Sequence, residues 1–216
     1  GVAVEDLAKR LGTPLFVYSR AHLRAQYRAL TSALLPLRPL ICYSVKANSN
    51  CSVIAALAAE GAGADVVSGG ELYRARRAGV SARRIVFAGV GKTEEEIDAG
   101  LRAGILFFAV ESEPELERIA ARAQRLGRTA RVALRVNPDV DPHTHHYIST
   151  GRKENKFGFD IERVRRAYER AASLRGVEVV GLHMHLGSQI LSPEPYVEAL
   201  RKIAPLCQDL RKRFAS

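Results

Sequence analysis

The sequence predicts an α/β fold built on a parallel β-sheet, in which each strand is followed by a helix. Short runs rich in β-branched and other apolar residues alternate with segments of about 10–15 residues that have helical composition. Six such strand–helix units follow one another between residues 40 and 216. The alternation fits a doubly wound open sheet or a (β/α)8 TIM barrel, and six units are three quarters of the eight that a barrel needs.

The units are recognised from their strands and from the residues that begin or end their helices. Strands are predicted at residues 40–45, 64–67, 84–87, 105–110, 131–136 and 177–185. Helices are predicted at residues 52–60, 70–78, from 93 onward, 111–126, 161–174 and 195–214. Gly61, Gly79 and Gly127 follow three of the helices, as is typical of helix ends. Thr93 and Glu96 have the spacing of a capping box, which predicts a helix start.

The N-terminal part lies before this alternation. Residues 15–18, Leu-Phe-Val-Tyr, have the composition of a strand, and a helix is predicted at residues 20–35. Because this strand stands apart from the six units, it is expected to belong to another sheet.

Composition and charge exclude several classes of protein. Of the 216 residues 47% are hydrophobic, which is typical of a globular chain, and no apolar run approaches the roughly 20 residues of a membrane helix. No secretion signal is visible, and Cys42, Cys51 and Cys207 are too scattered for a disulfide framework, so a cytoplasmic protein is expected. The net charge of +10 is assigned to solvated helix faces rather than to a nucleic-acid surface, because Trp is absent and aromatic residues do not accompany the basic clusters.

Residues with reactive or ionisable side chains lie at the ends of the predicted strands, where a barrel carries its active site. Lys46 follows the first strand, and Asp65 and Glu71 flank the end of the second. Arg135 lies within the fifth strand, and His183 and His185 share one face of the sixth. A zinc site built on these histidines and on His143, His145 and His146 is conceivable, but no Cys or Glu stands at metal-ligand spacing nearby, so no metal is predicted.

A lysine, a histidine and a Gly187-Ser188 turn at strand ends together indicate a cofactor that carries both an aldehyde and a phosphate. A desolvated Lys amine can attach to an aldehyde as a Schiff base, and a glycine turn with a hydroxyl can bind a phosphate. Pyridoxal 5'-phosphate has both groups, and it is the predicted cofactor.

Three motifs carry a resemblance to known proteins. Residues 43–48, Tyr-Ser-Val-Lys-Ala-Asn, resemble the lysine signature of the fold-type III pyridoxal-phosphate decarboxylases, the alanine-racemase-like barrels. Residues 137–158, which include Thr-His-His-Tyr-Ile-Ser-Thr-Gly at 144–151, and residues 183–189, His-Met-His-Leu-Gly-Ser-Gln, closely resemble the diaminopimelate decarboxylases within that family. The resemblance spans nearly the whole chain and implies an alanine-racemase-like barrel.

The resemblance also implies roles for individual residues. Lys46 would hold pyridoxal phosphate and later help to return a proton to the product, so Lys46 and His185 are the predicted catalytic residues. His185 would stack on the pyridine ring and Ser188 would bind the phosphate, while Asp65 would lie near Lys46 and Arg135 near the ring. Glu71 is a more remote candidate. The polar stretch at residues 140–155 would form a loop over the site.

The implied reaction is decarboxylation of meso-2,6-diaminopimelate to L-lysine and CO₂, a step of lysine biosynthesis. Alternatives are a basic amino-acid decarboxylase of the ornithine or arginine type and a non-catalytic pyridoxal-phosphate-binding homologue. The family's glycine-rich phosphate loop, its Glu-Pro-Gly-Arg segment and the Cys and Tyr of its C-terminal β-domain are not found in the sequence. Residues 1–19 are therefore expected to carry a strand of that β-domain, and residues 20–216 to form part of a barrel, truncated after about six units. This chain alone is expected to be inactive, and the full-length protein a homodimer.

Overall fold

The sheet of the protein is parallel, and its strands follow one another in chain order. The computed structural model describes residues 2–140, 157–188 and 190–214. In this part of the chain β1 (Cys42–Ser44), β2 (Gly63–Val66), β3 (Ile85–Phe87), β4 (Phe107–Val110) and β5 (Ala130–Asn137) lie side by side in that order. β7 (Val177–His183) and the short β6 (Phe159–Asp160) both pair with β5. A doubly wound sheet reverses its strand order near the middle, so this sequential order is that of a barrel wall.

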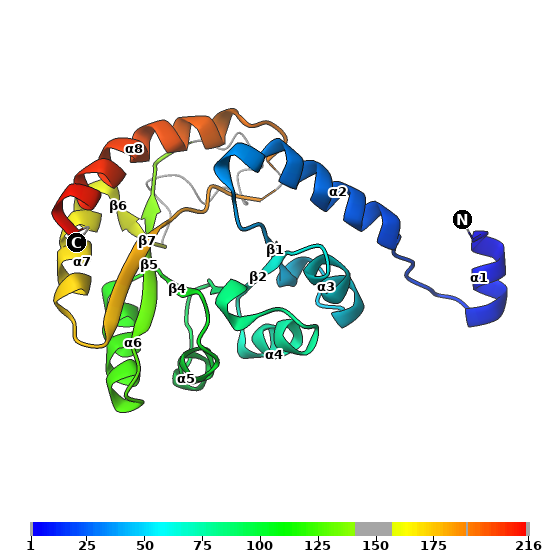
Figure 1. Cartoon of the computed structure of the whole chain (residues 1–216), viewed down its shortest axis with the longest axis horizontal. Helices are drawn as coiled ribbons and strands as arrows, with labels where there is room; N and C mark the ends of the chain where they lie inside the picture. Colours follow the sequence, from blue (N-terminus) through cyan, green and yellow to red (C-terminus); the bar gives the residue numbers. More distant parts are fainter. Residues whose placement is uncertain (1, 141–156, 189, 215–216) are drawn as a thin grey trace.

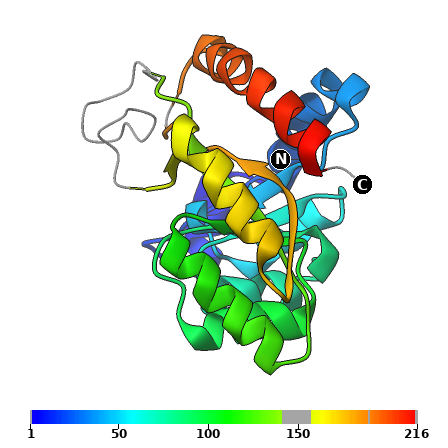
Figure 2. The same ribbon diagram turned by 90° about the vertical axis from the view of Figure 1, so that its left-hand side faces the viewer.

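Each strand leads into a helix that covers the outside of the sheet. The helices are α3 (Cys51–Ala58), α4 (Gly69–Arg77), α5 (Glu94–Ala103), α6 (Glu113–Arg125), α7 (Ile161–Ser173) and α8 (Glu194–Phe214). Short 3-10 helices lie at Leu35–Leu37, Val45–Ala47 and Ala82–Arg84. Figure 1 shows α3 to α6 following one another along one side of the sheet, and Figure 2 shows α6 and α7 next to each other outside it. The six predicted strand–helix units are confirmed.

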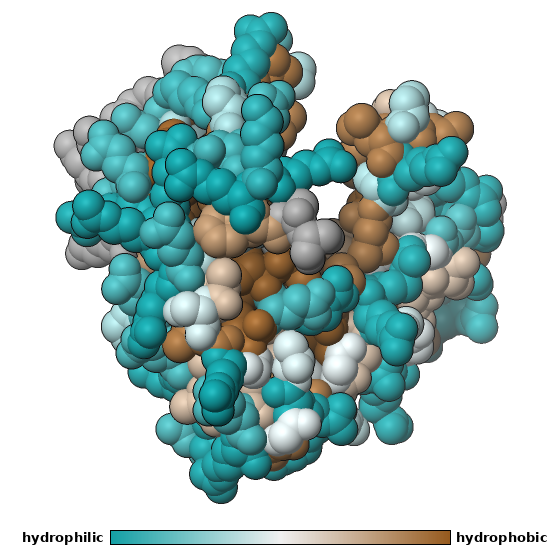
Figure 3. Space-filling view, turned by 60° about the vertical axis from the view of Figure 1, so that its left-hand side comes forward, coloured by the Kyte–Doolittle hydropathy of each residue, from teal (hydrophilic) through white to brown (hydrophobic). Residues whose placement is uncertain are grey.

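The two faces of the sheet differ in how well they are covered. On the outer face Ile85, Phe87 and Phe108 are fully buried beneath the helices, and each such side chain contributes roughly 1.5–3 kcal/mol. On the other face a row of paired residues crosses four strands and stays half-buried: Ser44, Asp65, Val86 and Phe107. Figure 3 shows hydrophobic residues in a hollow of one face of the molecule, surrounded by hydrophilic ones. The inner face of the barrel wall is therefore partly open.

Helix ends follow the local chemistry of the sequence. The Thr93 side chain accepts a hydrogen bond from the Glu96 backbone N–H, and the Glu96 side chain accepts one from the Thr93 backbone N–H, which confirms the capping box of α5. The Ser68 and Ser112 hydroxyls cap α4 and α6 by accepting hydrogen bonds from the backbone N–H groups of Glu71 and Glu115. These caps fix the points at which the chain leaves the carboxyl ends of β2, β3 and β4, and so they position the loops of the site.

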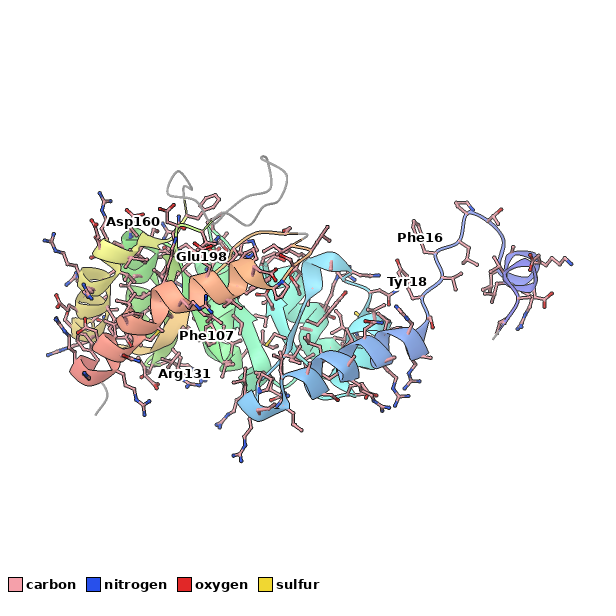
Figure 4. The ribbon with its side chains drawn as sticks, turned by 90° about the horizontal axis from the view of Figure 1, so that it is seen from above. Phe16, Tyr18, Phe107, Arg131, Asp160 and Glu198 are labelled. Carbon is pink, nitrogen blue, oxygen red and sulfur yellow. The ribbon has the colours of Figure 1, made fainter. Side chains whose placement is uncertain are left out.

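The N-terminal part lies outside the sheet and its helices, and it differs from the prediction. α2 (Arg20–Ala33) packs Leu23 and Tyr27 against α3, while α1 (Val4–Leu11), which was not predicted, buries no residue. Residues 15–18 form neither strand nor helix, because no described strand pairs with their backbone groups. Phe16 is 85% exposed, and Figure 4 shows it with Tyr18 outside the body formed by the sheet and its helices. No helix among the described residues is long and apolar enough to cross a membrane.

Candidate functional site

A cavity of about 230 Å³ lies at the carboxyl ends of the strands. Lys46, Asp65, Arg135, His183 and His185 all line it, although they come from four different strands or strand ends. The rest of its wall consists of Val67, Ala88, Gly89, Val90, Glu111 and Phe157. The structure therefore brings together most of the site residues that were predicted from the sequence.

Three other cavities contain none of the five predicted residues. One lies between α2 and α3, and another lies at the amino ends of β4 and β5, where Ile105 and Ala130 line it. The third adjoins the site and is lined by Lys92 and Glu115. Enzymes with a barrel of this kind carry their chemistry at the carboxyl ends of the strands. The cavity with Lys46 is therefore the candidate site, even though it is the smallest of the four.

Lys46 enters the cavity from the short 3-10 helix Val45–Ala47, which directly follows β1. The Tyr43 hydroxyl donates a hydrogen bond of 3.1 Å to the Asn48 carbonyl oxygen and closes the turn around the lysine. Asp65 on the neighbouring strand accepts a hydrogen bond of 3.2 Å from the Ser44 hydroxyl. Burial raises the pKa of Asp65, and the Ser44 hydroxyl and the Lys46 charge partly oppose this rise.

The two histidines occupy an environment that disfavours their charged form. Burial, together with the positive charges of Arg135, His185 and Lys92, lowers the pKa of His183 from 6.5 to about 4. Burial also lowers the pKa of His185, with further contributions from Arg135 and Lys46. His183 is therefore a neutral imidazole near pH 7, able to donate from one ring nitrogen and accept at the other.

Arg135 is held in the cavity by a carboxylate that the sequence interpretation missed. Its Nη1 lies 2.6 Å from Glu111 Oε2, and the two side chains are 10% and 3% exposed. The Gly158 backbone N–H donates to the Glu111 carbonyl oxygen at 3.1 Å, so the chain before β6 also contacts this pair. Glu111 directly follows β4. Considering the polar residues after the fourth predicted strand, as for the other strands, would have identified it.

Two buried polar atoms of this cavity have no hydrogen-bond partner among the described residues: Glu111 Oε1 and His183 Nδ1. Leaving a buried polar atom unpaired costs roughly 1–3 kcal/mol, so such atoms indicate a place for a bound molecule. A lysine amine for an aldehyde, an arginine for anionic oxygens and neutral imidazoles for an aromatic ring suit pyridoxal phosphate. The residues present fit this cofactor.

The structure separates some predicted residues from the cavity. Ser188 is exposed after β7 and does not appear in the described lining. The Glu71 carboxylate accepts a hydrogen bond of 2.8 Å from the Val67 backbone N–H and also lies outside that lining. Residues 141–156 of the expected loop, with His143, His145 and His146, lie outside the described residues. Among the described residues, no group of three His, Cys, Asp or Glu side chains could hold a metal ion.

Comparison with known proteins identifies curated relatives of about twice the length of this chain. The chain is 48% identical over 213 residues to diaminopimelate decarboxylase of Aquifex aeolicus, covering 99% of this chain and 50% of the relative. It is 50% identical over 210 residues to diaminopimelate decarboxylase of Pseudomonas aeruginosa, covering 97% and 51%. The chain thus spans about half the length of the curated relatives that it matches.

Solved structures give the same result for the fold. Diaminopimelate decarboxylase of Helicobacter pylori, solved with L-lysine, matches with a TM-score of 0.91 and 42% identity over 96% of this chain and 53% of its own. Lysine decarboxylase of Selenomonas ruminantium matches with a TM-score of 0.83 and 25% identity over 98% and 52%. Residues 20–215 match the family described as pyridoxal-dependent decarboxylase, pyridoxal binding domain. The predicted cofactor, pyridoxal phosphate, is thereby confirmed, and the chain belongs to the family of pyridoxal-dependent decarboxylases.

Proposed function

We propose that the protein carrying this chain is a pyridoxal-phosphate-dependent decarboxylase that converts meso-2,6-diaminopimelate to L-lysine and CO₂. The observation that carries this proposal is the cavity in which Lys46, Arg135, His183 and His185 meet beside unpartnered buried polar atoms. The substrate rests on the relatives, since solved diaminopimelate decarboxylases are 42% identical to the chain, against 25–26% for enzymes named lysine or lysine/ornithine decarboxylase.

When bound, pyridoxal phosphate supplies an electron sink that lets the carboxylate of an amino acid leave as CO₂. Lys46 is proposed to hold the cofactor through its Nζ and to return a proton to the carbon that loses the carboxylate. His185 is proposed to lie against the pyridine ring, where its lowered pKa favours an uncharged aromatic surface. Arg135 supplies positive charge near the ring, and Asp65 stays close to the Lys46 ammonium group.

Three further assignments complete the proposal. Ser188 is proposed to contact the cofactor's phosphate, which requires its turn to be part of a larger site. Residues 1–19 are proposed to join a second, β-rich domain, and the exposed Phe16 and Tyr18 supply the apolar surface for that contact. The full-length protein is proposed to be a homodimer, and its mass in solution by light scattering tests this.

The decisive experiment compares the wild-type full-length protein with Lys46→Ala. The wild type is expected to bind pyridoxal phosphate with a visible absorbance band and to release CO₂ from meso-diaminopimelate. Lys46→Ala is expected to lose the band, and Arg102→Ala, an exposed change on α5, serves as the control that retains it. Release of CO₂ from ornithine or arginine instead would favour the other substrate class. If the Lys46→Ala spectrum matched that of the wild type, the cofactor assignment would be wrong.

A further inference from the structure

A buried lysine lies close to the site without lining its cavity. Lys92 is only 2% exposed. Its Nζ donates to the Gly89 carbonyl oxygen at 2.7 Å, to the Ala109 carbonyl oxygen at 2.8 Å and to Glu115 Oε1 at 2.6 Å. An ammonium group has three N–H donors, so these contacts use all of them and leave none for a ligand. The Lys92 ammonium group therefore cannot bind substrate, and it can influence the site only through the residues that it contacts.

Glu115 connects Lys92 to a residue that lines the cavity. Its second oxygen, Oε2, accepts a hydrogen bond of 2.7 Å from the Glu111 backbone N–H. Glu111 is the first residue after β4, and its own carboxylate holds Arg135 at 2.6 Å inside the cavity. A continuous series of short, buried, charge-assisted contacts thus runs from Lys92 through Glu115 and Glu111 to Arg135.

The series joins loops that would otherwise be independent. Lys92 follows β3, Glu111 follows β4, and Arg135 lies in β5, so three neighbouring strand ends are linked. A buried ammonium or carboxylate is costly unless it is paired, and removal of one partner leaves the other uncompensated. The backbone that carries Glu111 is therefore expected to shift when Lys92 or Glu115 is lost.

We propose that Lys92 and Glu115 are positioning residues, which set the Glu111 carboxylate and through it hold Arg135 in the geometry that binds pyridoxal phosphate. This inference rests on the proposed function, because it assumes that the cavity receives this cofactor. Arg135 and Glu111 meet the bound molecule, and Lys92 acts only through them.

The test measures the dissociation constant of pyridoxal phosphate from the absorbance of the full-length protein. Lys92→Met keeps the length of the side chain and removes its charge. It is expected to weaken binding about tenfold or more, which is the typical loss when a residue that orients a ligating side chain is removed. The matched control is Arg122→Met, which breaks the 2.6 Å pair with Asp98 between α5 and α6, away from the cavity. It is expected to lower stability without changing cofactor affinity.

A double-mutant cycle separates positioning from a purely structural effect. If Lys92 acts through Glu111, the double variant Lys92→Met/Glu111→Gln should bind the cofactor no more weakly than the worse of the two single variants. If the affinity losses of the two single variants multiplied in the double variant, Lys92 would act independently of Glu111, and the proposal would be overturned. Should Lys92→Met fail to fold, Glu115→Gln replaces it, because its single amide oxygen cannot make both contacts that the two carboxylate oxygens make, one with Lys92 and one with the Glu111 backbone N–H. Cofactor binding is again expected to weaken, and unchanged binding would overturn the proposal.

One result would contradict the proposed function without deciding the positioning role of Lys92. If the wild-type protein bound no pyridoxal phosphate, the assignment of the cofactor site would fail, and crystal structures of the wild type and Lys92→Met without ligand would then decide the positioning role. Loss of the contact between Arg135 and Glu111 in the variant would support that role, and an unchanged contact would overturn it. An equal loss of cofactor affinity in Arg122→Met and Lys92→Met would also overturn it.

Discussion

His183 should make the protein lose stability in acid, and the effect can be isolated by one substitution. Its pKa is lowered from 6.5 to about 4 by burial and by the positive charges of Arg135, His185 and Lys92, while Glu111 lies in the same cavity. Between these two pKa values the unfolded chain binds a proton at this histidine that the folded chain does not bind. The free energy of unfolding therefore falls as the pH drops through this window, and it is unaffected by this group well above pH 6.5.

The size of this change in unfolding free energy follows from the difference between the folded and unfolded pKa values of His183. One pKa unit corresponds to about 1.4 kcal/mol, so the full effect of His183 is about 3 kcal/mol, and the loss between about pH 8 and about pH 5 is about 2 kcal/mol. The assay is urea unfolding of the cofactor-free protein at these two pH values. His183→Gln should remove about 2 kcal/mol of the pH dependence, because Gln does not titrate.

The comparison with another histidine decides whether burial is the cause. His22 is exposed on α2, so His22→Gln removes an imidazole without opening the cavity. The reasoning would be refuted if His183→Gln had the same pH dependence as the wild type, or if the two Gln variants changed it equally.

Three further substitutions test the packing and the backbone around the site. Gly100→Ala would place its Cβ 2.6 Å from Phe108 Cζ and should cost about 1–3 kcal/mol in urea unfolding, and an unchanged midpoint would contradict this contact. Gly158→Ala adds a side chain at a φ of +89° and 2.8 Å from the Arg135 carbonyl oxygen, so cofactor affinity measured by titration should fall. Equal affinity would mean that this turn does not hold Arg135. Thr93→Ala removes half of the capping box and should cost about 1 kcal/mol in thermal unfolding, whereas Thr93→Ser should cost less.

The order of strands and helices could be predicted because each unit carries its own local signals. The β5 strand is an eight-residue run of mostly buried residues, and its parallel neighbours supply the pairing that such a run needs. β6 could not be predicted, since two residues that pair only with the end of β5 carry no periodicity. The segment 15–18 has strand composition, yet composition alone does not form a strand without a partner.

The site was predictable where a residue follows its own strand and lines the cavity by itself. Lys46 and His185 satisfy this condition, since strand order alone brings them to the same end of the sheet. The pairing of Arg135 with Glu111 depends on β4 and β5 being neighbours, with the two residues 24 positions apart in the chain. The contact between Lys92 and Glu115 spans 23 positions for the same reason.

The buried pair of Lys92 and Glu115 also constrains how this sequence can change over evolutionary time. A single substitution that removes either charge leaves the other charge buried without its counterion, whereas a joint replacement by two apolar residues of similar volume can be close to neutral in stability. The two positions are thus expected to vary together among relatives, either both charged or both uncharged. A path of single mutations between these two states would pass through an intermediate that folds poorly.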